Sequence, residues 1–236
     1  MERYFHERLE LLNKKLLEMA ALAEEAIFKA TEAFKNLDVA MAARVVQHDA
    51  VIDAMEIEIE SLVIDILALQ QPIAKDLRFV TTGMKFNSEL ERIADLATNI
   101  AKCVLFMEHQ TTLKPIEDMH KLFAIALAMV RDAVSAFITR DYELAKKVIL
   151  SDAEADRLRT SIQDVLVNRY MLEDKAVIPR AVSLFLVTRH YERICDHATN
   201  IAEDVIFMIE AKVVKHHPEA LEKHEGHNGA SENAGE

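Results

Sequence analysis

The sequence predicts an all-α protein built as a tandem pair of antiparallel three-helix bundles with six long helices. Apolar residues recur with helical periodicity from residue 3 to about 210. The body of the chain holds a single glycine, Gly83, because the other three lie in the last eleven residues. A β-rich chain would need many more turn-forming residues. Finally, ERIADLATNIA at 91–101 returns as ERICDHATNIA at 192–202, with nine of eleven positions identical.

The breaks between the helices are few, and they match between the two halves. Asp38 and Asp141 follow the first turn of each half and are candidate N-caps. Pro72 and Pro179 mark the second turns, and Pro115 is expected at the first position of the fourth helix. The expected helices span 3–36, 39–70, 76–108, 115–139, 142–172 and 179–210.

Long helices joined by short turns must run antiparallel, so each half is expected to form its own bundle. The first bundle occupies 1–110 and the second 115–212. The remaining segment, 213–236, is polar, contains Gly and His, and is predicted to be disordered.

The repeat extends beyond its best-matching segment. VLFM at 104–107 matches VIFM at 205–208 with the same offset of 101, whereas HDAVID at 48–53 matches SDAEAD at 151–156 with an offset of 103. The difference of two residues falls in the hairpin turns, where a deletion has a small energetic cost.

The charge and the cysteines exclude several classes of protein. A net charge of -12 argues against nucleic-acid binding, which depends on a basic surface. The charged N-terminus lacks the apolar stretch of a secretory signal, and no apolar run approaches the roughly 18 residues of a membrane span. We therefore expect a cytoplasmic protein. Cys103 and Cys195 are not equivalent in the repeat, since Ala94 matches Cys195, so two reduced, buried thiols are expected rather than a disulfide or a zinc site.

Pairs of acidic residues spaced four apart carry the candidate chemistry. Such a pair lies on one face of a helix and is mildly destabilising, and Asp is a poor helix former. A single pair is usually just a solvated face, but here four pairs are repeated between the halves. The pairs are Asp49/Asp53, Glu91/Asp95, Asp152/Asp156 and Glu192/Asp196.

The heights of these pairs along the helices match. In each half, both pairs lie about 20 residues from the intervening turn, or roughly 30 Å along an α-helix. An antiparallel hairpin therefore brings four carboxylates to one level in each half. The helical wheel places Glu91 and Asp95 more than about 100° from the apolar stripe, on an outer or lateral face.

Four carboxylates at one level would repel one another unless a cation were bound. Hard or borderline cations suit ligands that are all oxygen. Asn99 and Asn200 continue the acidic stripe and are candidate ligands, or residues that orient a carboxylate. The sequence thus predicts a metal site in each half, with no catalytic or cofactor-binding residues beside it.

These features resemble the PhoU family, accessory regulators of bacterial phosphate uptake. The motifs DAVID, ERIAD, DAEAD and ERICD match its doubled E/D-x-x-x-D pattern, and QQPIAKDLR at 70–78 resembles its turn between the second and third helices. The likeness covers residues 1 to about 212. In the second half EDKAVIPRA places Arg180 out of register with Arg78, so a role of Arg78 is not expected to be duplicated.

The resemblance implies a cytoplasmic homodimer that binds multinuclear clusters of iron, zinc, manganese or magnesium and is peripheral to the membrane only through its partners. The implied partners are the ATPase subunit of the phosphate ABC transporter and a PhoR-type sensor histidine kinase. Through them, such proteins act as negative regulators of phosphate-starvation genes and limit phosphate uptake. Which metal binds, and whether phosphate itself binds, stays open.

Two other interpretations compete with a metal-binding, non-enzymatic regulator. A carboxylate-bridged di-metal oxidase would need Glu-x-x-His pairs facing a bundle interior, and these motifs contain none. A metal-free helical scaffold would use the acids only for solubility, and its melting temperature would not respond to divalent cations.

Overall fold

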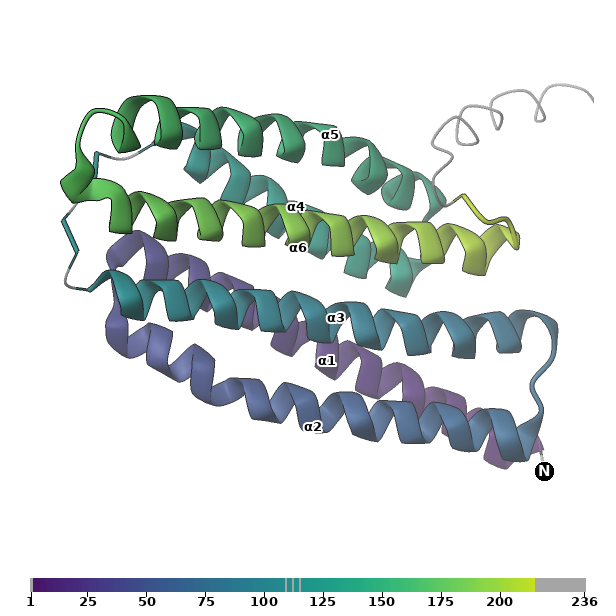
Figure 1. The fold of residues 1–236 in the computed structure, drawn as a ribbon. Helices are drawn as coiled ribbons and strands as arrows, with labels where there is room; N and C mark the ends of the chain where they lie inside the picture. The colour runs from purple at the N-terminus through teal and green to yellow at the C-terminus, as the bar shows by residue number, and fades with distance from the viewer. Residues whose placement is uncertain (1, 109, 112, 115, 215–236) are drawn as a thin grey trace, which may run out of the picture.

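A computed structural model describes residues 2–108, 110–111, 113–114 and 116–214, and two three-helix bundles lie side by side in it (Figure 1). The described residues contain no strand, so the predicted all-α class is confirmed. The long helices are α1 (Glu2–Asn36), α2 (Val39–Gln70), α3 (Ala74–Met107), α4 (Glu117–Thr139), α5 (Tyr142–Val165) and α6 (Ile178–Glu210).

Both predicted N-caps are present. The side chains of Asp38 and Asp141 each accept a hydrogen bond from the backbone N–H three residues later, at 2.8 and 3.0 Å. The residues before them, Leu37 and Arg140, have φ of 51° and 54°. This left-handed conformation ends the preceding helix, and the Asp starts the next one.

The second hairpin departs from the predicted helix ends. The chain was expected to stay α-helical to residue 172, but α5 ends at Val165 and continues as a π-helix, Leu166–Met171. Over little more than one turn, apolar spacing does not distinguish the two kinds of helix. A short 3-10 helix, Lys175–Val177, then leads into α6, and Pro179 stands in the first turn of α6 as predicted.

Two predicted boundaries at the ends of the second bundle also shift. The helix α4 begins at Glu117 rather than at 115, and Pro115 lies outside the described residues. The predicted tail begins too early, because Val214 is buried against the core. Residues 215–236 lie outside the described part of the chain.

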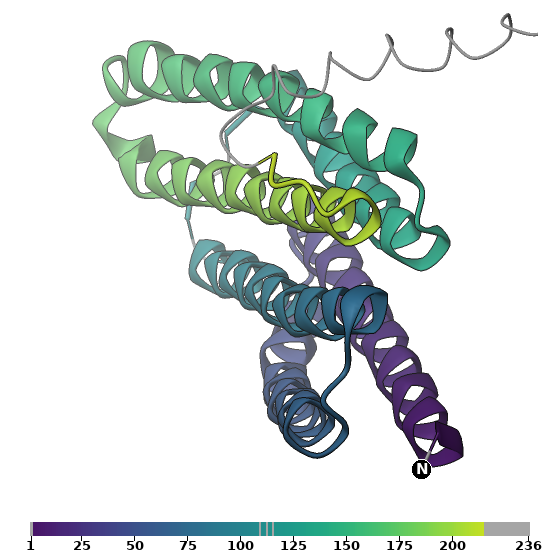
Figure 2. The ribbon, with the colours of Figure 1, turned by 90° about the vertical axis from the view of Figure 1, so that its right-hand side faces the viewer.

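The repeated helices α3 and α6 pack against each other in the centre, with α2 and α5 on the outer sides (Figures 1 and 2). Arg78 at the start of α3 donates to the carbonyl of Met208 at the end of α6, at 3.3 Å. Arg180 at the start of α6 donates to the carbonyl of Met107 at the end of α3, at 3.0 Å. The two helices are therefore antiparallel, and Arg78 and Arg180 make equivalent contacts, which the sequence did not make clear. A one-residue difference in register is absorbed within the first helical turn.

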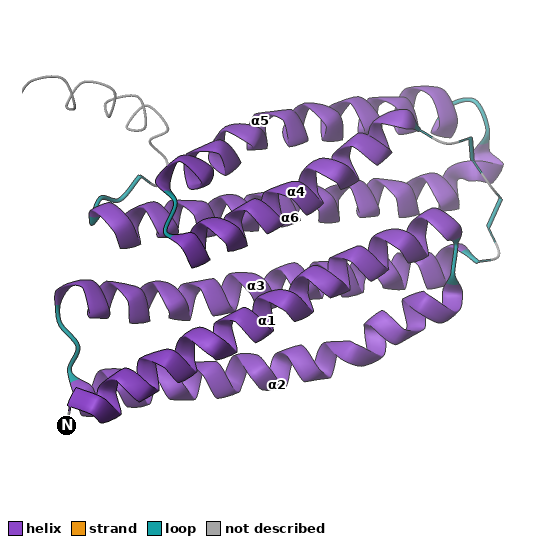
Figure 3. Ribbon diagram, turned by 180° about the vertical axis from the view of Figure 1, so that it is seen from behind, coloured by secondary structure: helices purple, strands orange, loops and turns teal. Residues whose placement is uncertain are grey.

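Buried aromatic residues join the two halves into one core. Tyr191 of α6 is fully buried, and its hydroxyl lies 2.7 Å from that of Thr31 on α1. The ring of Phe86 on α3 stacks on Phe137 of α4 at 4.0 Å between centroids. From behind, α1 crosses the pair formed by α2 and α3 and reaches the second bundle (Figure 3). The helices that carry the acidic pairs therefore pack against one hydrophobic core that both halves share.

One described helix, α4, is long and apolar enough to cross a membrane by length and composition alone. No such apolar run was expected from the sequence. Half of its most apolar window is buried in the second bundle, where α4 packs on α5 and α6. A core helix passes the same test, so this feature is accounted for by packing.

Candidate functional site

The first acid cluster gathers carboxylates from α2 and α3, as the heights along the helices predicted. Burial raises the pKa of Asp49, a hydrogen bond from Thr98 at 3.1 Å opposes this, and the charges of Asp53 and Asp95 raise it further. Burial also raises the pKa of Glu91, again with Asp53 and Asp95 contributing. Asp53 and Asp95 therefore lie within electrostatic range of both Asp49 and Glu91.

The second acid cluster repeats this arrangement on α5 and α6. Burial raises the pKa of Asp152 to about 6, and the charges of Asp196, Asp156 and Glu192 add to the effect. Partial desolvation raises the pKa of Glu192, with the charges of Asp196 and Asp156 adding to the effect and Arg159 opposing it. Partial desolvation and the charge of Asp156 also raise the pKa of Asp196, although that side chain is exposed on one side. Arg159 lies 3.6 Å from both Asp156 and Glu192, yet the pKa values of three of the four acids remain raised.

The clusters lie on lateral faces, not in the bundle interiors. Asp53, Asp95, Asp156 and Asp196 are exposed, and the other acid of each pair is half-buried. An interior di-metal site of the oxidase type is therefore not the arrangement found.

The two asparagines behave differently. Asn99 donates to Asp95 at 3.1 Å, so it orients a carboxylate of its own cluster. Asn200 instead donates to Glu89 of α3 at 3.3 Å, and the Nδ1 of His197 lies 2.6 Å from the same oxygen. Burial alone would raise the pKa of Glu89, but these two contacts hold it below its ordinary value. Asn200 therefore links the two halves.

The two clusters also differ by a charge reversal that was not predicted from the sequence. Glu56 lies one turn beyond Asp53 and contributes to the raised pKa of Glu91. With the offset of 103, its counterpart is Arg159, whose Nε lies 3.6 Å from Glu192. Extending the acidic stripe by one turn would have revealed the difference. The first cluster has a fifth acid where the second has a cation.

His190 of α6 was also missed. It occupies the position that matches Glu89 in the repeat and lies within electrostatic range of Asp95 in the other half. Its Nδ1 is buried without a hydrogen-bond partner. Nothing in the spacing of its own half pointed to it, because the contact forms only when α6 packs on α3.

Carboxylate and amide oxygens are suitable ligands for hard cations, and the mutual repulsion within each cluster favours cation binding. Among the described residues, however, no three His, Cys, Asp or Glu side chains are already arranged around one ion. Binding would therefore require carboxylates to rotate toward a common point, which exposed Asp and Glu side chains can do through ordinary rotamer changes.

The cysteines are not candidate ligands, although Cys195 lies within electrostatic range of the four acids of the second cluster. Cys103 is half-buried and Cys195 is buried, and both are free thiols. Burial raises the pKa of both, so the unreactive protonated form is favoured.

Comparison with known proteins places this geometry in a family. The family model described as PhoU domain matches residues 16–104 and 119–205, once in each half. A phosphate-specific transport system accessory protein PhoU homolog of Aquifex aeolicus is 42% identical over 208 residues, covering 88% of this chain and 94% of the relative. PhoU homolog 1 of Thermotoga maritima is 32% identical and covers 90% and 91%.

Solved structures agree with this assignment. PhoU from Pseudomonas aeruginosa superposes with a TM-score of 0.84 at 33% identity, covering 88% of this chain and all of that one. The phosphate transport system regulatory protein PhoU from Streptococcus pneumoniae gives a TM-score of 0.82 at 27% identity, covering 89% and 99%. With a family domain matched in both halves and a shared fold throughout, the chain belongs to the PhoU family.

Proposed function

We propose that this chain is a metal-binding cytoplasmic regulator, not an enzyme, that limits phosphate uptake and represses phosphate-starvation signalling. The observation that carries the proposal is the pair of lateral carboxylate clusters, repeated on the central hairpins of a chain whose relatives are named as accessory proteins of phosphate-specific transport. The proposed partners are the ATPase subunit of a phosphate ABC transporter, a sensor histidine kinase and a second copy of this chain.

The proposed ligand atoms in both clusters are carboxylate oxygens. Asp49, Asp53, Glu91 and Asp95 would hold a cation in the first half, and Asp152, Asp156, Glu192 and Asp196 would hold one in the second. Iron, zinc, manganese and magnesium all fit oxygen ligands, and the clusters do not select among them. A bound cation supplies positive charge that neutralises the repelling carboxylates.

Neutralisation has a mechanical consequence. Repulsion of Glu91 by acids of α2 opposes the close packing of the first hairpin, and repulsion of Asp152 by Asp196 and Glu192 acts between α5 and α6, where Arg159 partly offsets it. A cation that bridges the two helices would stiffen each hairpin. Because α3 and α6 also form the contact between the halves, both clusters can influence the shape that a partner meets.

Metal content tests the site assignment. Chelator-treated protein should regain divalent cations on dialysis and melt at a higher temperature in their presence, because a ligand that binds only the folded state raises stability by about 2.7 kcal/mol at 100 times its Kd. The double variant Asp95→Ala, Asp196→Ala should lose both effects. Unchanged metal content in that variant would show that the ions bind elsewhere.

Co-purification tests the regulatory role. Tagged protein should recover the transporter ATPase from phosphate-replete cells, and cells lacking the chain should express phosphate-starvation genes in high phosphate. Light scattering across a concentration series checks the homodimer. Normal repression in cells without the chain would refute the proposed function even if metal binding were found.

A metal-free helical adaptor is the second candidate, and the absence of a preformed ion cage among the described residues favours it. In that case the acids serve solubility or electrostatic recognition of a partner. The melting series separates the two, since only the metal-binding form responds specifically to divalent cations, whereas screening of repulsion responds equally to sodium chloride at matched ionic strength.

A further inference from the structure

A second kind of site lies between α1 and α2, beside the first acid cluster but distinct from it. It is a cavity of about 250 Å³, partly open to solvent, and its floor is apolar. Leu22 and Ala26 of α1 and Val45 and Ile52 of α2 form this floor. Its volume lies just below the range of about 300–1,000 Å³ typical of small-molecule sites, so it suits a small ligand.

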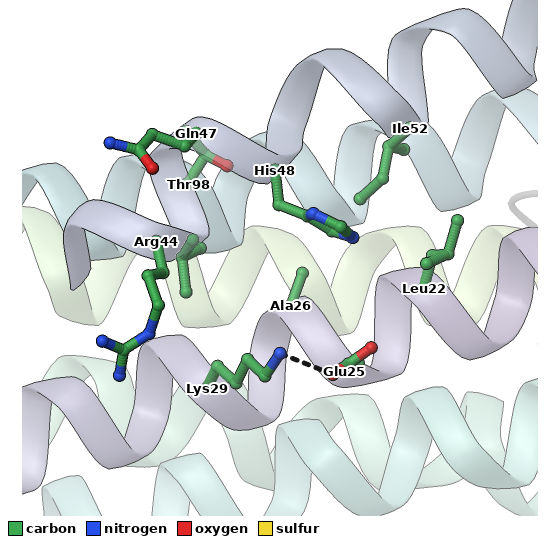
Figure 4. A pocket seen from close by; sticks show the side chains of 10 residues that line it. Leu22, Glu25, Ala26, Lys29, Arg44, Gln47, His48, Ile52 and Thr98 are labelled. Atoms are coloured by element: carbon green, nitrogen blue, oxygen red, sulfur yellow. Dashed lines mark ion pairs between the residues drawn. The ribbon is translucent and has the colours of Figure 1, made fainter. Parts of the chain in front are cut away.

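Polar side chains, among them the cations Arg44 and Lys29, form the rim of the cavity. Arg44 and His48 reach from α2 toward α1, where Lys29 and Glu25 lie (Figure 4). Lys29 pairs with Glu25 at 2.5 Å, whereas Arg44 has no ion pair with any described residue. The rim thus offers two cations against one carboxylate, with a guanidinium whose charge is not yet matched.

The repeat supplies an internal comparison. An offset of 103 carries this cavity onto one of about 190 Å³ between α4 and α5. There Asp132 replaces Lys29, and Ser151 replaces His48. The remaining cation, Lys147, is already paired with Asp132 at 2.7 Å. The hollow is therefore common to both repeats, but only the first has a cation available for a ligand.

We propose that the cavity of the first repeat binds a small organic anion, with a phosphate monoester as its best-fitting class. Arg44 and Lys29 would hold the anionic group from opposite walls, and the guanidinium fork suits two phosphate oxygens. The apolar body of the ligand would lie on the floor, where it leaves water. Inorganic phosphate would contact the rim cations Arg44 and Lys29 but would leave the apolar floor exposed to water. None of the residues proposed to hold the ligand belongs to the acid clusters, although Thr98, which lines the cavity, donates to Asp49, so failure of this proposal would leave the proposed function unaffected.

Titration calorimetry of the full chain with phenyl phosphate tests the proposal. The parent should bind phenyl phosphate more tightly than inorganic phosphate or phenol, because neither of these satisfies both rim and floor. Arg44→Gln should weaken binding about tenfold or more, since it removes a charge-assisted pair of hydrogen bonds. Arg44 is exposed, so this variant should keep the far-UV spectrum and melting temperature of the parent.

The second repeat provides the matched controls. Lys147→Gln should leave the affinity for phenyl phosphate unchanged, whereas Lys29→Asp with His48→Ser, which copies the second cavity, should abolish binding. Equal affinity for inorganic phosphate and phenyl phosphate would overturn the organic ligand. Equal affinity of the parent and Arg44→Gln would overturn the cavity as the site.

Discussion

Replacing Asp152 by asparagine in chelator-treated protein probes the electrostatics of the second acid cluster. The side chain is half-buried, and burial together with three neighbouring carboxylates raises its pKa from 3.8 to about 6. Asparagine has almost the same shape as aspartate and carries no charge, so the change removes the repulsion with little effect on packing. We expect this substitution to stabilise the metal-free protein at pH 7.

The magnitude follows from the pKa in the folded and unfolded states. Between pH 3.8 and about 6 the folded protein binds the proton more tightly than the unfolded chain, so stability falls as pH rises through this window. A difference of about 2 in pKa corresponds to about 3 kcal/mol, and partial exposure reduces this to about 1–2 kcal/mol. Asp152→Asn should recover this amount at pH 7 and almost none at pH 4.

Urea unfolding followed by circular dichroism at both pH values measures the effect. The exposed Asp164→Asn on the same helix is the control and should change stability by less than about 0.5 kcal/mol. Manganese should stabilise the parent more than the Asp152→Asn variant, which has lost a ligand. The reasoning fails if Asp152→Asn is less stable than the parent at pH 7 without metal, or if its gain is as large at pH 4.

Three other substitutions test features on which the fold or the clusters depend. Asp141→Ala should lower stability by about 1 kcal/mol in urea unfolding, because it removes an N-cap hydrogen bond; unchanged stability would argue against the cap. Tyr191→Phe should cost about 1 kcal/mol by losing the buried contact with Thr31, and a cost near zero would mean that this contact contributes little. Arg159→Gln should increase the free energy of stabilisation by manganese by about 1 kcal/mol, because it removes the cation 3.6 Å from Glu192; a smaller stabilisation than in the parent would contradict the assignment of the second cluster.

Features with a strong local cause were predictable from the sequence. The N-caps at Asp38 and Asp141 depend on a hydrogen bond three residues away, and the structure contains both. The levelling of Asp49 with Asp95 follows from helix rise and turn position alone, and their electrostatic coupling agrees with it. The π-helix after Val165 was not predictable, because it changes the helical spacing for only a few residues.

Contacts between the two halves could not be predicted from the sequence. Arg78 and Arg180 each bond to the far end of the opposite helix, although their positions in the repeat differ by one residue. Sequence position did not predict this, because the contact depends on how α3 and α6 pack against each other. The same packing sets His190 near Asp95 and directs Asn200 to Glu89. None of these pairs shares a helix.

The sequence by itself determined the helices, their antiparallel order and the two levels of acidic residues, because periodicity, capping and the rise of a helix act within one segment or one hairpin. Only the tertiary structure decided that α3 packs on α6 between the two halves. It also decided that Arg44 in the first cavity lacks an ion pair among the described residues, whereas Lys147 in the second is paired with Asp132. These depend on side chains that meet from distant parts of the chain. The repeated ERIAD and ERICD segments thus specified where the carboxylates stand, and packing specified what surrounds them.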